Sequence, residues 1–137
     1  RQHLSSELGF SREHRDLNIR RIGYVASEVA KHGGIAVCAA IAPYANARKD
    51  ARELVAAEGA FIEVFVDTDL EECKKRDRKG LYAKAMAGQL KGMTGIDDPY
   101  EEPEQAEIIV STDSEVSDSV DMILDYLHQH GFIQLEE

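Results

Sequence analysis

Between Lys79 and Glu101 the chain concentrates side chains that bind ligands and residues that form turns. The span contains two glycines, a lysine, two tyrosines and a pair of aspartates: Gly80, Gly95, Lys79, Tyr82, Tyr100, Asp97 and Asp98. Functional loops held by a rigid scaffold have this kind of composition. A loop that only crosses the surface would need none of these side chains, so we interpret the span as a functional loop.

Cations gather near the amino terminus, at Arg1, Arg12, Arg15, Arg20 and Arg21. A helix that begins after Ser11 places Arg15 and Asn18 on one face near its positive end. The planar guanidinium group suits phosphate or sulfate oxygens, and Phe10 stands where an aromatic ring can cover a planar ligand. The alternative is a solvated basic helix face, which the spacing alone favours.

Three short apolar runs predict the strands that would position these residues. They are Ile35 to Ile41, Phe61 to Val66, and Ile108 to Val110 with a possible extension to Thr112. None alternates between apolar and polar residues, as expected for strands covered on both faces.

Helical patterns flank the apolar runs, at about 11–32, 46–57, 69–76 and 116–130. Ser11 is the expected N-cap of the first helix, Gly33 and Gly34 end it, and Gly131 ends the last. Strands that alternate with helices predict an α/β domain with a parallel sheet and right-handed crossovers. Three strands are few for such a fold, which usually has about five, so we expect its first strands to lie outside residues 1–137.

Polar residues follow each predicted strand, where ligands bind in parallel sheets. The three segments are Ala42-Pro43-Tyr44, Asp67-Thr68-Asp69 and Thr112-Asp113-Ser114. Asp67 has either a mechanistic or a helix-capping role, and capping is the favoured interpretation.

Composition excludes several classes of partner. The 137 residues are 43% hydrophobic and carry a net charge of -10, which argues against duplex nucleic acid and anionic membranes. Cys38 and Cys73 have no metal-type spacing, Cys38 is expected to be a buried thiol, and a reducing cytoplasm is the natural compartment. The chain shows no signal peptide and no apolar run near the ~20 residues of a membrane span. The five histidines have no metal spacing with carboxylates, so we expect no metal ligand from the protein.

The chain contains no GxxxxGK[ST], HExxH, CxxC or GxSxG motif. The residues by themselves therefore predict an α/β domain that binds a small, anionic, aromatic ligand.

Six sequence blocks, in their order and spacing, resemble the adenylylsulfate (APS) kinase family. They are Leu8 to Ser11, Arg15 to Arg21, Ile41 to Tyr44, Phe61 to Thr68, Arg76 to Tyr82, and Thr94 to Glu101. The resemblance covers nearly the whole chain and corresponds to roughly the last two-thirds of the family domain.

The resemblance implies a P-loop NTPase-like three-layer fold with a parallel sheet, whose amino-terminal strand and P-loop are missing from residues 1–137. It implies transfer of the γ-phosphoryl group of ATP to the 3′-hydroxyl of adenosine 5′-phosphosulfate (APS), which gives PAPS, with Mg²⁺ accompanying ATP. Residues 1–137 would form one APS kinase-like domain with a lid at about 76–101. A cytoplasmic location and a homodimer are also implied.

The resemblance assigns roles to individual residues. Arg1, Arg15 and Asn18 would hold the phosphosulfate group, and Phe10 would stack on the substrate adenine. The remaining substrate contacts would be Ile41, Ala42, the lid cation Lys79, and the step Gly92-Met93 that closes over the base. On the ATP side, Arg76 would lie near the nucleotide, and Thr112 to Ser114 would lie near the adenine.

The chain departs from the family pattern at several positions. The Walker A loop and the aspartate expected to act as base are absent from residues 1–137. His14 replaces the usual Asp, Ala42 the usual Ser, and Met93 the usual Phe. Met93 exchanges a flat stacking partner for a flexible thioether.

Three interpretations remain open. The first is an APS kinase, either standalone or fused to ATP sulfurylase. The second is a non-catalytic APS-kinase-like module that binds PAPS or APS and regulates an attached sulfurylase. A generic nucleotide kinase is the weakest, because the block from Thr94 to Glu101 fits APS kinase better.

Overall fold

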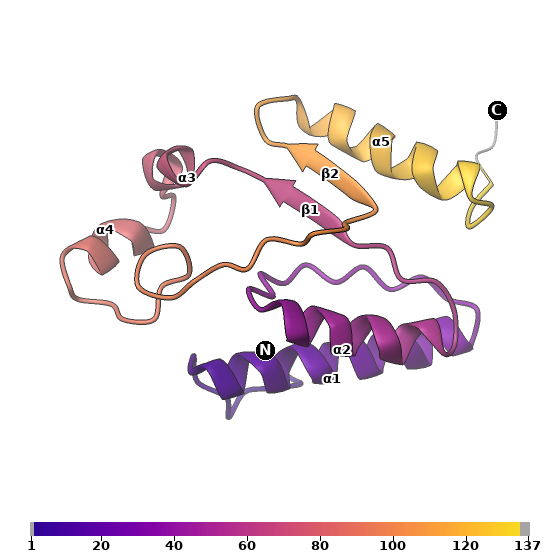
Figure 1. Ribbon diagram of the computed structural model, residues 1–137, viewed down its shortest axis with the longest axis horizontal. Helices are drawn as coiled ribbons and strands as arrows, with labels where there is room; N and C mark the ends of the chain where they lie inside the picture. Colours follow the sequence, from indigo (N-terminus) through magenta and orange to yellow (C-terminus); the bar gives the residue numbers. More distant parts are fainter. Residues whose placement is uncertain (1, 135–137) are drawn as a thin grey trace. The chain divides into compact units, whose positions relative to one another are not determined.

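The computed structural model describes residues 2–134 of the chain. Its elements, in chain order, are α1 (Arg12–Lys31), α2 (Ala45–Ala56), β1 (Val64–Asp67), α3 (Leu70–Arg76), α4 (Leu81–Met86), β2 (Ile108–Ser111) and α5 (Val116–Gln129) (Figure 1). The predicted α/β class with a parallel sheet is confirmed. Arg1, which the family resemblance implies as a substrate contact, lies outside the described residues.

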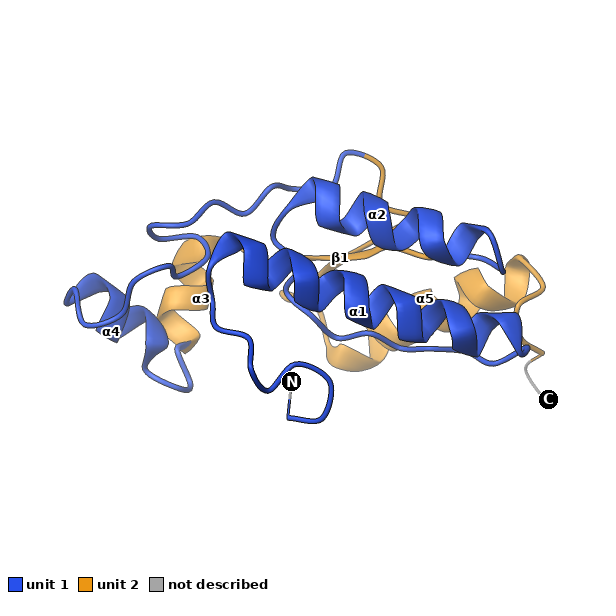
Figure 2. Ribbon diagram, turned by 90° about the horizontal axis from the view of Figure 1, so that it is seen from below, with its two compact units in different colours: residues 1–61, 77–104 blue, residues 62–76, 105–137 orange. Residues whose placement is uncertain are grey.

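The described chain divides into two compact units that interleave in sequence (Figure 2). Unit 1 consists of Arg1–Phe61 and Asp77–Glu104, and it contains α1, α2 and α4. Unit 2 consists of Ile62–Arg76 and Gln105–Glu137, and it contains β1, α3, β2 and α5.

Helices α1 and α2 lie side by side and form the core of unit 1 (Figures 1 and 2). The buried residues Ile19, Ala47 and Ala51 form its centre. The two helices approach closely at Gly23, where an added Cβ would lie 3.0 Å from the Cβ of Ala51. A small residue on each helix therefore sets the spacing between them.

Ser11 begins α1 as the sequence predicts, because its side chain accepts a hydrogen bond from the backbone N–H of His14 at 3.3 Å. Such a cap satisfies a backbone donor that has no partner within the helix. The predicted ends of α1, α2 and α5 agree with the structure to within a residue or two.

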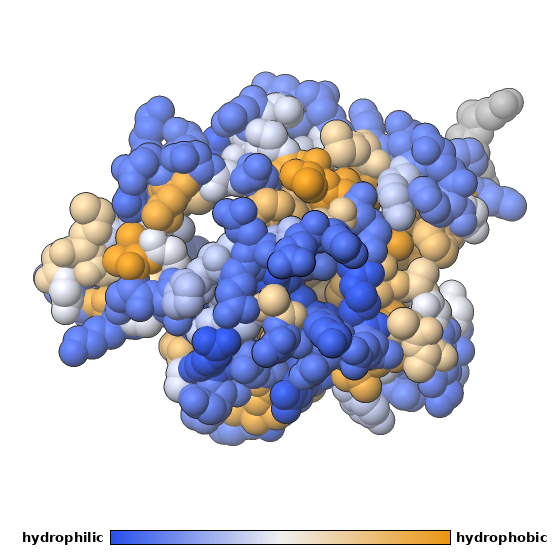
Figure 3. Space-filling view, viewed as in Figure 1, coloured by the Kyte–Doolittle hydropathy of each residue, from blue (hydrophilic) through white to orange (hydrophobic). Residues whose placement is uncertain are grey.

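The predicted strand at Ile35–Ile41 is wrong, since the structure has no strand in this segment. Ile35, Val37 and Ile41 are 63%, 92% and 68% exposed. A strand needs a hydrogen-bonded neighbour, and among residues 2–134 only β1 and β2 pair as strands in a sheet. Cys38 lies in the same segment and is exposed, so the predicted buried thiol is also wrong. On the face of the molecule shown in Figure 3, hydrophobic residues are exposed among hydrophilic ones.

The sheet of unit 2 consists of β1 and β2 in parallel, from the pair Val64 and Ile108 to the pair Asp67 and Ser111. Helix α5 packs next to β2 (Figure 1).

Asp67 is the last residue of β1 and does not cap the helix that follows. The bond at the start of α3 comes from Asp69 instead, whose Oδ1 accepts from the backbone N–H of Glu71 at 2.8 Å. The favoured capping role of Asp67 is therefore wrong.

Helix α4 interrupts the span that the sequence predicts to be a loop. It follows Gly80, and Asp77 accepts hydrogen bonds from the backbone N–H groups of Tyr82 and Ala83 at 3.1 and 2.9 Å. Those bonds satisfy the free donors of its first turn, which lets a helix form between glycines.

Candidate functional site

The first turn of α1 presents Arg15 to a tight turn formed by residues 92–98, here called the 92–98 turn. Nη1 of Arg15 donates to the hydroxyl of Thr94 at 2.6 Å, and Nη2 donates to the carbonyl of Gly92. Nε donates to the carbonyl of Phe10 at 2.9 Å. One guanidinium therefore joins the start of α1 to part of the predicted lid.

The 92–98 turn is held together by Asp97. Its carboxylate accepts from the backbone N–H groups of Gly92 at 2.7 Å and Met93 at 2.6 Å. These bonds stabilise the ionised form and lower the pKa of Asp97 below its ordinary value. Gly92 has φ 70°, a left-handed conformation that favours glycine.

Asp98 lies between Arg15 and the buried ring of Tyr44. Its Oδ2 accepts from the hydroxyl of Tyr44 at 2.6 Å and lies 3.4 Å from Nη1 of Arg15. Burial, together with this hydrogen bond, raises the pKa of Tyr44 to about 12. The phenol is 1% exposed, so it stays neutral and acts as a donor.

Glu101 attaches the end of the predicted lid to α2. Its Oε2 accepts from the backbone N–H of Ala45 at 2.7 Å, and its Oε1 accepts from Arg12 at 3.2 Å. The guanidinium of Arg12 also lies over the ring of Tyr44, 4.2 Å from its centre. The bond from Ala45, followed by the charge of Arg12, lowers the pKa of Glu101. The first backbone N–H of α2 and one guanidinium thus meet at a single carboxylate.

The structure brings together Arg15, Phe10, Gly92 and Met93 among the predicted substrate contacts, through the bonds given above. Asn18 follows one turn later on α1 and is buried, at 9% exposed. Phe10 is 70% exposed.

Other predicted substrate contacts are not joined to Arg15. Ile41 is 68% exposed, and Ala42 packs against the core of unit 1 with φ 43°. The carbonyl of Ala42 accepts from Nη1 of Arg48 at 2.8 Å. Lys79 is exposed, and within residues 2–134 it has no ion-pair partner.

Two predicted ATP contacts meet within unit 2. Nη2 of Arg76 donates to the carbonyl of Thr112 at 3.1 Å, while the Thr112 hydroxyl lies 2.8 Å from that of Thr68. Arg76 also donates to Glu72 at 2.8 Å, which lowers the pKa of that carboxyl. Ser114 is exposed. The juxtaposition places a cation at the ends of β1 and β2, where parallel sheets bind ligands.

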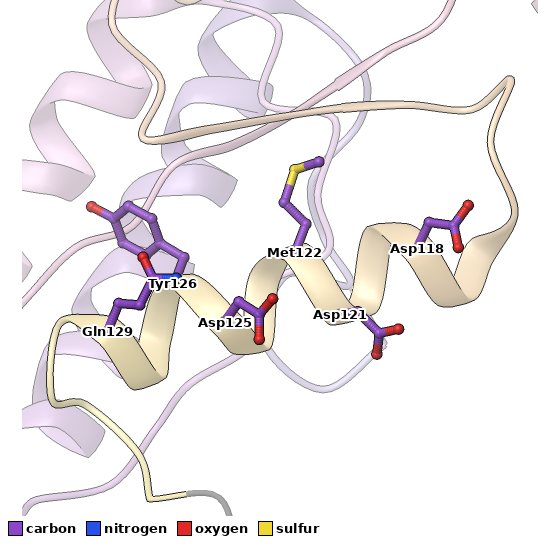
Figure 4. A pocket seen from close by; sticks show the side chains of 6 residues that line it. All are labelled: Asp118, Asp121, Met122, Asp125, Tyr126 and Gln129. Atoms are coloured by element: carbon purple, nitrogen blue, oxygen red, sulfur yellow. The ribbon is translucent and has the colours of Figure 1, made fainter.

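Two hollows on the surface of the described residues contain none of these predicted site residues. One, of about 510 Å³, lies along α5 and is lined by Asp118, Asp121, Met122, Asp125, Tyr126 and Gln129 (Figure 4). The other, of about 570 Å³, lies between α1 and α2. Three aspartates repel an anionic ligand, so charge alone disfavours the α5 hollow as a nucleotide site.

The described part of the chain has no group of three His, Cys, Asp or Glu side chains that could hold a metal ion. Its helices are also too short or too polar to cross a bilayer, as far as residues 2–134 show.

Tyr44, Asp98 and Glu101 belong to sequence motifs, but the sequence alone assigns them no role. The signal was present in the blocks Ile41 to Tyr44 and Thr94 to Glu101. The sequence does not reveal that these side chains lie close together in the fold, because Tyr44 and Asp98 are 54 residues apart.

Comparison with known proteins gives consistent matches. The family described as adenylylsulphate kinase matches residues 1–111. An adenylyl-sulfate kinase of Synechococcus sp. (strain JA-3-3Ab) is 50% identical over 135 residues, which are 98% of this chain and 75% of that protein. A sulfate adenylyltransferase of Aspergillus oryzae is 52% identical over 133 residues, which are 96% of this chain and 23% of that protein.

A solved structure has the same fold. The Mycobacterium tuberculosis APS kinase, in complex with AMPPNP and APS, matches with a TM-score of 0.90 and 40% sequence identity. The match covers 93% of this chain and 75% of that one. The chain thus spans about three quarters of these two kinases and less than a quarter of the fungal sulfate adenylyltransferase.

Proposed function

The chain belongs to the adenylylsulphate kinase family, and from this premise we propose that it carries the sulfated-nucleotide site of an enzyme that makes PAPS. In this reaction the 3′-oxygen of APS attacks the γ-phosphorus of ATP. The bond from that phosphorus to the β,γ-bridging oxygen breaks, ADP leaves, and the hydroxyl releases its proton. Because phosphoryl transfer depends mainly on positioning and on charge stabilisation, the contribution of these residues is to bind and orient.

The contacts of Arg15 carry the proposal. Its guanidinium donates to the backbone carbonyls of Phe10 and Gly92, so that the cation lies between the backbone of an exposed aromatic residue and the 92–98 turn. A sulfated adenine nucleotide needs a donor group for its anion, a flat surface for its base and a cover that excludes water. Arg15, Phe10 and the step Gly92-Met93 offer these three features.

Lys79 and the ATP-side residues complete the proposal. Lys79 would approach the phosphates when the lid closes, because it is exposed and has no ion-pair partner in the described chain. Arg76, Thr112 and Ser114 would bind ATP, and the bond from Arg76 to Thr112 supports their common role. Arg1, Asn18, Ile41 and Ala42 remain proposed substrate contacts.

ATP would enter as its Mg²⁺ complex, which lowers the negative charge that the transfer must overcome. The described residues offer no cluster of metal ligands, so no residue of this chain is assigned to the metal.

A homodimer and a cytoplasmic location belong to the same proposal. The unpaired thiols of Cys38 and Cys73 are compatible with a reducing compartment. A fused ATP sulfurylase is a further possibility, supported by the fungal sulfate adenylyltransferase that contains a similar segment.

The test is the formation of PAPS from APS and ATP by the complete protein in the presence of Mg²⁺. ATP-dependent appearance of PAPS with matching release of ADP is the expected result. Binding of APS or PAPS without turnover would instead favour the regulatory module, for which the replacements at Ala42 and Met93 are the motivating observation. Absence of both binding and turnover would refute the proposal.

A further inference from the structure

A phenol, a carboxylate and a guanidinium form a continuous chain inside unit 1. The hydroxyl of Tyr44 donates to Oδ2 of Asp98 at 2.6 Å, and the same oxygen lies 3.4 Å from Nη1 of Arg15. Tyr44 is 1% exposed, and the side chains of Arg15 and Asp98 are 13% and 22% exposed. Polar contacts shielded from water in this way hold their geometry better than those on the surface.

The chain restricts the orientation of Arg15. Asp98 is itself fixed at both ends, because its side chain accepts from Tyr44 and its backbone carbonyl accepts from the N–H of Gly95 at 2.8 Å. A fixed carboxylate next to Nη1 leaves the guanidinium little freedom to rotate. Its Nε then meets the carbonyl of Phe10, and its Nη1 meets the hydroxyl of Thr94.

We propose that Tyr44 and Asp98 are positioning residues for the anion site: acting through Arg15, they set the affinity for the sulfated nucleotide without touching it. The identity of that nucleotide rests on the proposed function. The positioning itself rests only on the contacts within unit 1.

A purely structural role for these residues would give a different result. Tyr44→Phe keeps the ring that packs beneath Arg12 at 4.2 Å and removes only the hydroxyl. Asp98→Asn keeps the shape of the side chain and removes its charge. If the two residues only stabilised the fold, these variants would lower the melting temperature without a selective effect on one substrate.

The kinetic experiment compares Michaelis constants for APS and ATP in the complete protein. Tyr44→Phe and Asp98→Asn are expected to raise KM for APS about tenfold, the usual size for loss of a hydrogen bond in a charged network. KM for ATP should stay within about twofold, since both residues act on Arg15 alone. Equal changes in both constants, or no change in either, would overturn the proposal.

Matched controls come from residues of α1 and α2. Tyr24→Phe removes the hydroxyl of an exposed tyrosine on α1. Asp50→Asn removes a carboxylate that pairs with Arg20 at 3.0 Å on the surface. Both controls should retain the wild-type constants. A rise in KM for APS in the controls equal to that in the test variants would also overturn the proposal.

A double-mutant comparison tests whether the effect passes through Arg15. In an Arg15→Ala background, Tyr44→Phe should change KM for APS by less than about twofold, because residues that act as a unit are not additive. A full tenfold effect that persists without Arg15 would contradict the positioning role.

A readout without catalysis separates this inference from the proposed function. The Nε–H of Arg15 gives a nuclear magnetic resonance signal, which Arg15→Lys identifies by its loss. Its exchange with water should be faster in Tyr44→Phe than in the wild-type protein and unchanged in Tyr24→Phe. If the wild-type protein made no PAPS, the proposed function would fail, and equal exchange in Tyr44→Phe and wild type would separately overturn the positioning role.

Discussion

The carboxylate of Glu101 accepts a hydrogen bond at 2.7 Å from the backbone N–H of Ala45, the first residue of α2. Tyr44, the N-cap residue of α2, makes no side-chain capping bond of its own. A residue 56 positions away therefore caps this helix. The cap joins the end of the predicted lid to one of the two helices that form the core of unit 1.

Glu101→Gln should loosen this attachment. The amide carries no charge, so it interacts less with the positive end of α2 and with Arg12. We expect the melting temperature to fall by about 3 °C in thermal unfolding followed by circular dichroism. Glu102→Gln, at an exposed neighbour, is the control and should melt like the wild type. Equal melting temperatures for both variants would contradict the capping role.

Acid should weaken the 92–98 turn and the Glu101 cap together. Hydrogen bonds from backbone N–H groups lower the pKa of Asp97 and of Glu101 below the ordinary values of 3.8 and 4.5. As the pH falls, these two carboxylates therefore bind protons in the unfolded chain before they do so in the folded protein. The stability that they contribute to the folded protein is complete above about pH 5 and is lost as the pH falls through their lowered pKa values.

This acid effect is measured as the melting temperature at pH values from 7 to 3. Over this range, proton linkage predicts loss of the stabilisation that the ionised carboxylates provide. Asp97→Asn removes one of the two titrating groups, so its melting temperature should depend less steeply on pH than that of the wild type. Identical slopes would show that Asp97 has no share in the acid response.

Tyr44 should ionise at a higher pH than an ordinary tyrosine. Burial and the bond to Asp98 raise its pKa to about 12, so the stability that depends on the neutral phenol is complete below the ordinary pKa of 10.0 and is lost as the pH rises through about 12. The near-ultraviolet absorbance of phenolate should show a late step that disappears in Tyr44→Phe and persists in Tyr24→Phe. Persistence of that step in Tyr44→Phe would contradict the assignment.

Ala42→Gly should stabilise the protein slightly. Ala42 has φ 43°, a left-handed conformation that costs a residue with a side chain about 1–2 kcal/mol. Glycine relieves this cost, although its greater freedom in the unfolded chain takes back about 0.5–1 kcal/mol. We expect a net gain of about 0.5 kcal/mol in urea unfolding. Ala60→Gly, at an exposed position without a positive φ, should not stabilise, and a loss at Ala42 equal to that at Ala60 would show that no strain is relieved.

Local sequence signals predicted the parts of the fold that depend on neighbouring residues. Ser11 before the helical pattern marked the start of α1, and Gly33 and Gly131, with φ of 77° and 74°, marked helix ends. The strand from Ile108 followed from a short β-branched run. These features depend on capping, backbone freedom and side-chain branching, which are properties of a few residues in a row.

Features that depend on distant partners were not predicted. The run from Ile35 to Ile41 has the composition of a strand, but a strand forms only where another strand pairs with it. Helix α4 forms where Asp77 satisfies the first backbone N–H groups, which a polar, glycine-flanked sequence does not reveal.

The residues of the candidate site also fall into those that local sequence predicts and those that depend on distant partners. Arg15 and Phe10 were predicted because they are close in sequence at the start of one helix. The role of Asp98 was missed because its partners, Tyr44 and Arg15, lie 54 and 83 residues before it. Proximity of that kind is produced by folding, and residue types alone do not encode it.

The most direct test of the central claim is the pair of Michaelis constants for APS and ATP in the Arg15→Ala variant of the complete protein. Loss of hydrogen bonds to a charged group should raise KM for APS about thirtyfold, with KM for ATP within about twofold. Arg20→Ala, which removes a surface pair with Asp50, should match the wild type in both constants. An equal rise in both constants for Arg15→Ala, with the fold intact, would contradict the account.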